Sequence, residues 1–188
     1  GFASPKEKGI IRPKEFEGKK YGAWGSPIEY AMLKVLMACD GGDVDKVEFV
    51  NVGWADYFVV TERDVDFAWI FYGWTGIEAE LRHKPLNIVM LKDWDRCVPD
   101  YYTPLIVTGE QQIKEKTDLV RRFMRATARG YKFAIENPAE AAEILIQHAP
   151  ESDPELIRRS QAWLSAQYQA DAPRWGEQKL EVWKRYAD

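Results

Sequence analysis

The stretch VDFAWIFYGWTGIEAELR, residues 65–82, decides the fold class, because a strand pattern changes into a helix pattern within it. Its first eight residues are mostly apolar and β-prone, which predicts a buried strand over residues 65–72. A turn with two glycines follows, and a helix is expected from Thr75 to about Arg82. A strand that passes through a glycine turn into a helix is typical of an α/β sheet with helices on its faces.

The stretch YGAWGSPIE, residues 21–29, repeats this order of strand, glycine, tryptophan and helix start. It completes a strand expected over residues 19–24. A capping box is expected at the start of the next helix, with Ser26 at the N-cap, Pro27 first and Glu29 third. The helix should then continue to a pair of glycines that stops it.

The remaining elements are expected to alternate at first and to be helical after about residue 110. Strands are expected over residues 46–52, 85–91 and 98–110. Helices are expected over residues 55–62 and 118–136, then behind the caps Asn137 and Asp153, and finally over residues 176–186. The first part therefore predicts a β-α-β-α-β sheet, whereas the last part predicts packed helices.

The charge balance excludes some classes of partner. The formal net charge is −4 and the pI is about 5.4, which argues against nucleic acid or an anionic membrane as the main partner. The basic pairs at residues 121–122 and 158–159 fall in mixed-charge helices, so we expect them to be solvated. No run of about 18 apolar residues occurs. No signal peptide is recognised, and the opening GFASPKEKGI resembles the interior of a protein more than its start.

Cysteine and histidine are few and scattered, so the sequence indicates no metal site. For Cys39 and Cys97 we expect two unpaired thiols, with a single disulfide as the alternative. Neither His83 nor His148 has a nucleophile beside it. The phosphate-loop, dinucleotide, nucleophile-elbow and zinc-protease motifs do not occur. The sequence therefore indicates no catalytic residue and no cofactor.

Tryptophan is unusually frequent in this sequence, with eight residues among 188. Trp24 ends one predicted strand and Trp74 follows another, at the sheet edge where α/β proteins bind ligands. Their rings would suit the walls of a slot for a flat ligand, and packing in the core or between domains is the alternative. Glu78 also has two interpretations, because it can contact a ligand or complete a capping box with Thr75.

Four longer stretches resemble one family: EGKKYGAWGSPIE, VDFAWIFYGWTGIEAEL, VPDYYTPLIVT and YQADAPRWGEQKLEVWKRYAD. They are similar to the substrate-binding proteins of ABC importers for thiamine pyrimidine precursors, and the resemblance covers residues 1–188. It implies the type II periplasmic-binding-protein fold, in which two α/β lobes close on a ligand about two crossovers. The implied ligand is an aminopyrimidine, such as a formylaminopyrimidine or a hydroxymethylpyrimidine. The implied partners are importer membrane subunits, and the implied location is extracytoplasmic.

The resemblance also implies roles for single residues. Tyr72 and Trp74 would lie against the ligand ring, and Glu78 would accept a hydrogen bond from its exocyclic amine. The turn of Trp24, Gly25, Ser26 and Pro27 would face the same cleft. Tyr101 and Tyr102, on the returning crossover, would close the edge of the pocket.

Relative to that family the chain looks truncated at its N-terminus, because about one hundred residues of lobe one have no counterpart. Residues 19–99 are expected to form lobe two, while residues 1–18 and 100–188 form the remainder of lobe one. A homodimer or a swapped assembly would cover the apolar faces thus exposed. Two alternative functions remain: a pyrimidine-synthase-type enzyme of thiamine biosynthesis, and a truncated dimerisation module that binds no ligand.

Overall fold

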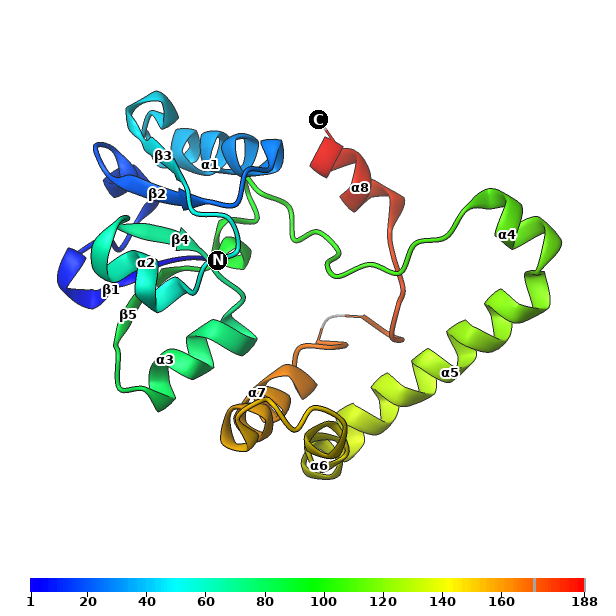
Figure 1. Cartoon of the computed structure of the whole chain (residues 1–188). Coiled ribbons are helices and arrows are strands. Elements are labelled where there is room, and N and C mark those ends of the chain that lie inside the picture. Colours follow the sequence, from blue (N-terminus) through cyan, green and yellow to red (C-terminus); the bar gives the residue numbers. More distant parts are fainter. Residues whose placement is uncertain (171, 188) are drawn as a thin grey trace. The chain divides into compact units, whose positions relative to one another are not determined.

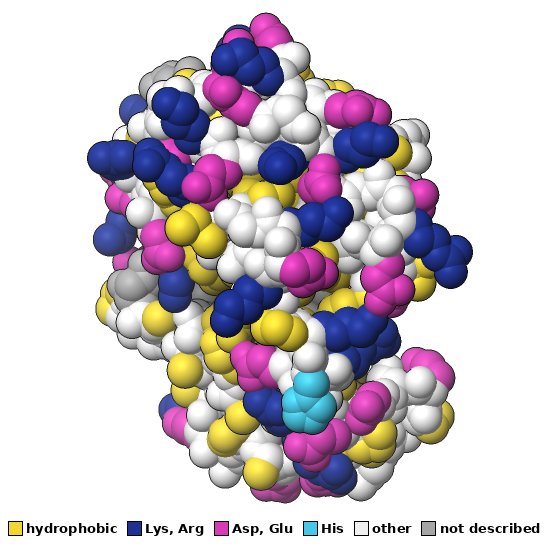
Figure 2. Space-filling model, turned by 90° about the vertical axis from the view of Figure 1, so that its left-hand side faces the viewer, with side chains coloured by type: hydrophobic (Ala, Val, Ile, Leu, Met, Phe, Trp, Pro, Cys, Tyr) yellow, Lys and Arg dark blue, Asp and Glu magenta, His cyan; other side chains and the backbone are white. Residues whose placement is uncertain are grey.

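The computed structural model describes residues 1–170 and 172–187, which form two compact units (Figure 1). Unit 1 contains residues 1–101 and 181–187, and unit 2 contains residues 102–180. On the face shown in Figure 2, acidic and basic side chains are interspersed. Within the described residues, no helix is long and apolar enough to cross a membrane.

Unit 1 is built on a five-stranded sheet of order β3-β2-β4-β1-β5. The strands are β1 (Phe2–Pro5), β2 (Lys20–Ala23), β3 (Glu48–Asn51), β4 (Phe67–Trp69) and β5 (Leu86–Val89). Strand β2 runs parallel to β3 and β4, whereas β1 is antiparallel to β4 and β5. The predicted α/β sheet is therefore confirmed. The carboxyl ends of β2, β3 and β4 meet at one edge.

The helices of unit 1 follow the predicted order. Those within residues 1–101 are α1 (Pro27–Cys39), α2 (Tyr57–Arg63) and α3 (Ile77–Leu81), the last preceded by a π-helical turn (Tyr72–Gly76). Short 3₁₀ segments lie at Lys6–Lys8, Pro13–Phe16, Val44–Lys46 and Leu91–Trp94. The apolar face of α1 is buried, and the predicted capping box at its start is formed.

Aromatic rings fill the core of unit 1. The rings of Phe16 and Phe67 stack with centroids 4.2 Å apart, and Phe2 meets both of them edge-on. Tyr21 and Leu33 are completely buried beside them. Burial of such side chains stabilises the unit by roughly 1.5–3 kcal/mol each.

The N-terminal segment differs from the expected division of the chain. Strand β1 pairs with β4 on one side and with β5 on the other, so it lies inside the sheet. Residues 1–18 therefore belong to the same compact unit as residues 19–99, rather than to a unit with residues 100–188. The four residues of β1 are too short a signal to reveal such pairing in the sequence.

Cys39 and Cys97 form a disulfide, so the expectation of two unpaired thiols was wrong. The bridge joins the last residue of α1 to the segment behind β5, with the two Cα atoms 6.1 Å apart. The fold brings together positions that are 58 residues apart in the chain. Sequence spacing carries no signal for that contact.

The strand predicted over residues 98–110 was also wrong. The segment forms no strand, and residues 103–109 are exposed. Its β-prone residues have no neighbouring strand with which to form a ladder within the described residues, and propensity alone does not make a strand.

Unit 2 is helical. It contains α4 (Glu110–Glu115), α5 (Thr117–Glu136), α6 (Pro138–His148) and α7 (Pro154–Ser165). Ala142, Leu156 and Ile157 are buried between α6 and α7, while α5 has no buried residue. Asp153 caps α7 as predicted, but the amide of Asn137 bonds the end of α5 instead of capping α6.

The last helix, α8 (Leu180–Ala187), begins later than predicted and returns the chain to unit 1. The ring of Tyr186 stacks on Tyr101 with centroids 4.6 Å apart. The guanidinium of Arg185 donates to the carbonyl oxygen of Asp95 at 2.7 Å.

Candidate ligand-binding site

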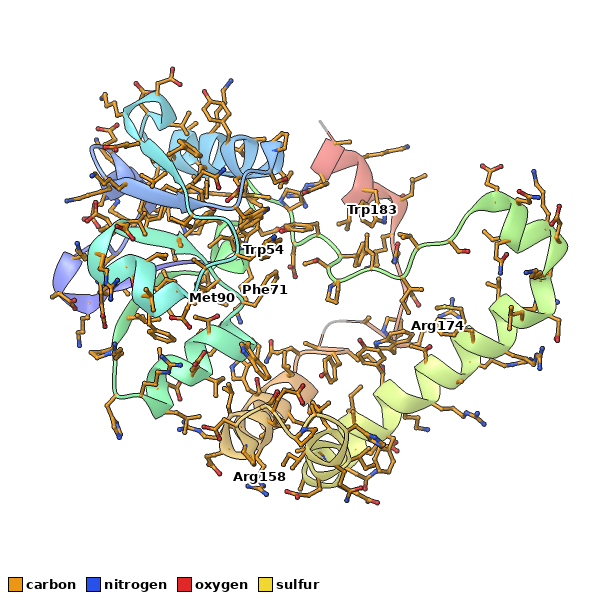
Figure 3. The ribbon with its side chains drawn as sticks, in the orientation of Figure 1. Trp54, Phe71, Met90, Arg158, Arg174 and Trp183 are labelled. Carbon is orange, nitrogen blue, oxygen red and sulfur yellow. A yellow bond between two sulfur atoms is a disulfide. The ribbon has the colours of Figure 1, made fainter. Side chains whose placement is uncertain are left out.

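Aromatic side chains gather at the carboxyl edge of the parallel strands in unit 1. Trp24 follows β2, Trp54 follows β3, and Phe71 and Trp74 follow β4. Trp54 is 87% exposed and Phe71 is 67% exposed, and both project from these loops in Figure 3. Large exposed rings at a sheet edge where α/β proteins bind ligands mark a candidate site.

Two of these tryptophans stack on one another. The rings of Trp24 and Trp54 stack with centroids 5.8 Å apart and planes 16° apart. Behind them, Trp69 on β4 lies against Trp24 with centroids 5.4 Å apart. Trp69 supports the ring of Trp24, and the largely exposed ring of Trp54 presents a π-face to a second flat molecule.

Trp54 was not among the residues predicted from the sequence, although a signal was present. The stretch NVGWAD, residues 51–56, again places glycine and tryptophan directly behind a strand. It is the third occurrence of the design seen at Trp24 and Trp74. Asn51, at the end of β3, also lies near the site, since its side-chain nitrogen is 3.7 Å from the position that a Cβ would take on Gly25.

The turn after β2 is shaped by Glu29. Its carboxylate accepts the backbone N–H groups of Trp24 at 3.1 Å, Gly25 at 3.0 Å and Ser26 at 2.9 Å. Gly25 has φ of +93°, in the region that favours glycine. These N–H groups are therefore engaged by the protein's own carboxylate. Pro27 is exposed at the first helical position, and its predicted contact with a ligand stays a prediction.

The turn after β4 begins its helix earlier than predicted. A π-helical turn spans Tyr72–Gly76, and neither it nor α3 has a side-chain cap. The expected capping box of Thr75 and Glu78 was therefore wrong, because Thr75 already lies inside helical backbone. π-helical turns are frequent at functional sites. Trp74 is 42% exposed on this turn.

Glu78 lies on α3, one helical turn behind Trp74, and its carboxylate forms an ion pair with Arg82. The guanidinium of Arg82 in turn lies 4.5 Å from the centre of the Phe58 ring. Because the helical backbone begins before Thr75, Glu78 does not complete a capping box. The other interpretation, contact with a ligand, stays a prediction.

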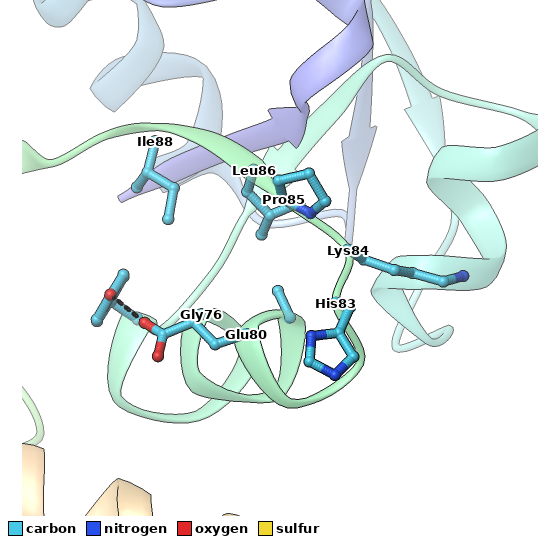
Figure 4. A pocket seen from close by; sticks show the side chains of 9 residues that line it. Gly76, Glu80, His83, Lys84, Pro85, Leu86 and Ile88 are labelled. Atoms are coloured by element: carbon cyan, nitrogen blue, oxygen red, sulfur yellow. Dashed lines mark hydrogen bonds between the residues drawn. The ribbon is translucent and has the colours of Figure 1, made fainter.

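Tyr72 lines a groove of about 540 Å³ between α3 and β5 (Figure 4). Its hydroxyl donates to Oε1 of Glu80 at 2.7 Å. Gly76 leaves room for the ring, since a Cβ there would lie 2.6 Å from Cδ2 of Tyr72. Glu80 and His83 form one wall of the groove and Leu86 forms part of the other. The predicted stacking of Tyr72 on a ligand stays a prediction.

Tyr101 and Tyr102 belong to different units. Tyr101 lies in unit 1 against Tyr186, and burial raises the pKa of Tyr101 to about 12. The hydroxyl of Tyr102 accepts the backbone N–H of Lys179 at 2.8 Å within unit 2. Both tyrosines thus have structural contacts, and their role at a pocket edge stays a prediction. Among the described residues, no cluster of His, Cys, Asp and Glu could hold a metal ion.

Residues 1–141 match the family model described as NMT1/THI5 like. The chain belongs to the NMT1/THI5-like family. The match includes all three aromatic turns, the whole β-sheet and residues 98–110, which follow the sheet.

Two known proteins resemble this NMT1/THI5-like chain. The formylaminopyrimidine-binding protein of Halalkalibacterium halodurans is 26% identical over 155 residues, which are 81% of this chain and 46% of that protein. The chain therefore spans less than half the length of this curated relative. The alkanesulfonate-binding protein SsuA of Xanthomonas axonopodis pv. citri, solved with bound MOPS, superimposes with a TM-score of 0.65 at 14% identity. That match covers 98% of this chain and 60% of SsuA, so the NMT1/THI5-like chain shares the fold of periplasmic binding proteins.

Proposed function

We propose that this protein is the solute-binding component of an ABC importer and binds an aminopyrimidine precursor or breakdown product of thiamine. The observation that carries the proposal is the stacked pair of Trp24 and Trp54 at the carboxyl edge of the sheet. The name of the relative with 26% identity supports the pyrimidine class. The resemblance of whole stretches to pyrimidine-precursor binding proteins supports it too.

The chemistry of the edge suits an amino-substituted ring. The exposed face of Trp54 would stack on the pyrimidine, and stacking of a base on an aromatic side chain contributes roughly 1–3 kcal/mol. Glu78 would accept from the exocyclic amine, and a hydrogen bond to a charged acceptor is about twice as strong as a neutral one. Binding of this kind needs no catalytic group, and the relatives are named as binding proteins, so we propose that the protein is not an enzyme.

Location and partners follow from the same proposal. The disulfide between Cys39 and Cys97 favours an oxidising compartment, as expected for an extracytoplasmic protein. The membrane subunits of an importer would be the partners. We further propose that unit 1 corresponds to lobe two of a two-lobed binding protein, and that unit 2 belongs to lobe one.

Isothermal titration calorimetry tests the proposal with an amino-substituted hydroxymethylpyrimidine, and a ring that lacks the amine serves as control ligand. Trp54→Ala should weaken binding of the aminopyrimidine by about 1–3 kcal/mol without loss of folding. The comparison variant is Trp94→Ala, which removes the same ring from the 3₁₀ segment behind β5, where Trp94 packs against the core; it should lower stability but leave affinity unchanged. The proposal fails if no aminopyrimidine binds, or if both variants lose affinity equally.

A further inference from the structure

Glu29 is a buried carboxylate at the candidate site, with only 1% of its surface exposed. Its Oε1 accepts from the hydroxyl of Tyr21 at 2.7 Å and from the backbone N–H of Trp24 at 3.1 Å. Its Oε2 accepts from the N–H groups of Gly25 at 3.0 Å and Ser26 at 2.9 Å. Two oxygens thus hold four donors, about as many as a carboxylate can accept.

These donors occupy a place that otherwise attracts anions. They lie where β2 ends and α1 begins, at the positive end of the helix dipole. Free N–H groups at such a position bind phosphate, sulfate or carboxylate groups. In this protein the position is filled from within, because Glu29 supplies the anion itself.

A capping role alone does not account for the arrangement. A capping box needs the carboxylate only at the N–H of the N-cap residue, which is Ser26. Glu29 also accepts hydrogen bonds from the backbone N–H groups of Trp24 and Gly25 and from the buried hydroxyl of Tyr21. It therefore fixes the whole turn that carries Trp24.

We propose that Glu29 is a specificity-determining residue that excludes anionic ligands from this edge, so that the site takes a neutral or cationic nitrogen heterocycle. The inference rests on the proposed function. A ligand phosphate or sulfonate would find the donors of this turn engaged, and it would be repelled by a carboxylate that burial shields from solvent. The fold does not set ligand charge, since a protein named for alkanesulfonate binding shares it.

The unaltered protein provides the first test. Its affinity for an amino-substituted hydroxymethylpyrimidine is compared by calorimetry with its affinity for the phosphate ester of the same compound. We expect the ester to bind at least about tenfold more weakly, a difference of roughly 1.4 kcal/mol. Equal or tighter binding of the ester would overturn the inference. If neither compound binds, the proposed function fails, and the second test decides the inference by itself.

The second test asks whether the turn binds an anion once Glu29 is removed. Thermal unfolding of Glu29→Ala is measured in sodium acetate and in sodium chloride of equal ionic strength. Acetate replaces the lost carboxylate, so it should raise the midpoint of this variant by at least about 3 °C more than that of the unaltered protein.

Glu15→Ala is the matched control, because Glu15 also accepts two backbone N–H groups, those of Ile11 and Arg12, away from the site. Its response to acetate should equal that of the unaltered protein. If Glu29→Ala does not fold in either salt, Glu29→Ser is used, which also removes the carboxylate from the four donors and should respond in the same direction. An equal response of all variants to acetate would overturn the inference.

Discussion

Removal of the disulfide should cost unit 1 much of its stability. Cys39 and Cys97 are 58 residues apart, so their bridge closes a long loop in the unfolded chain and lowers its conformational entropy. The loop-entropy relation gives about 4 kcal/mol for a loop of this length at 25 °C. The double variant Cys39→Ser and Cys97→Ser should therefore unfold with a free energy lower by about 4 kcal/mol, within a total that is commonly 5–15 kcal/mol.

Urea titration followed by tryptophan fluorescence measures this difference, with the unaltered protein in dithiothreitol as a second sample that lacks the bridge. Both should show a lower midpoint than the oxidised protein, because both lack the same constraint. The single variant Ala38→Ser, next to the bridge on α1, controls for the insertion of a hydroxyl and should unfold like the oxidised protein. The reasoning is refuted if both bridge-free samples lose less than about 1 kcal/mol.

Three further changes probe the site and its support. Glu78→Gln should weaken aminopyrimidine binding by about 1–3 kcal/mol in calorimetry, and unchanged affinity would leave Glu78 only its helical ion pair. Gly76→Ala should lower the free energy of unfolding by about 1–3 kcal/mol in urea titration, because its methyl group would displace the ring of Tyr72, and an unchanged value would contradict that packing. The hydrogen bond from Arg12 lowers the pKa of Asp40 below its usual 3.8. The ionised carboxylate therefore stabilises the folded protein above pH 3.8, and this stabilisation is lost as the pH falls through the lowered pKa. In Asp40→Asn, the unfolding midpoint should fall less between pH 6 and pH 2 than in the unaltered protein. An unchanged pH dependence would exclude Asp40 as its cause.

Local signals in the sequence predicted most elements, because caps and hydrophobic periods act over a few residues. The start of α1 behind Ser26 and the start of α7 behind Asp153 are confirmed. The alternation of strands and helices over the first part is confirmed as well. The predicted capping box at Thr75 was wrong because the helix already begins with a π-helical turn before Thr75. No side-chain pattern predicts such a turn.

The features that sequence reasoning missed depend on partners far along the chain. The pairing of β1 between β4 and β5, the disulfide and the unpaired segment after residue 98 are all set by tertiary contacts. Some residues of the candidate site were likewise predictable from local sequence, whereas others depend on tertiary contacts. Trp24 and Trp74 were predicted from their turns, while the stacking of Trp54 on Trp24 required strands β2 and β3 to be neighbours.

The return of α8 to unit 1 affects how the protein is made at the ribosome. Residues 102–180 leave the ribosome before residues 181–187, which complete unit 1 beside Tyr101. The contacts of unit 2 join helices that are close in sequence, and such contacts form quickly. Because synthesis proceeds at about 5–20 residues per second, unit 2 has time to fold before Tyr186 can reach its partner. A chain paused before residue 181 thus carries the helices α4 to α7 of unit 2 and a sheet unit that still lacks the contact of α8.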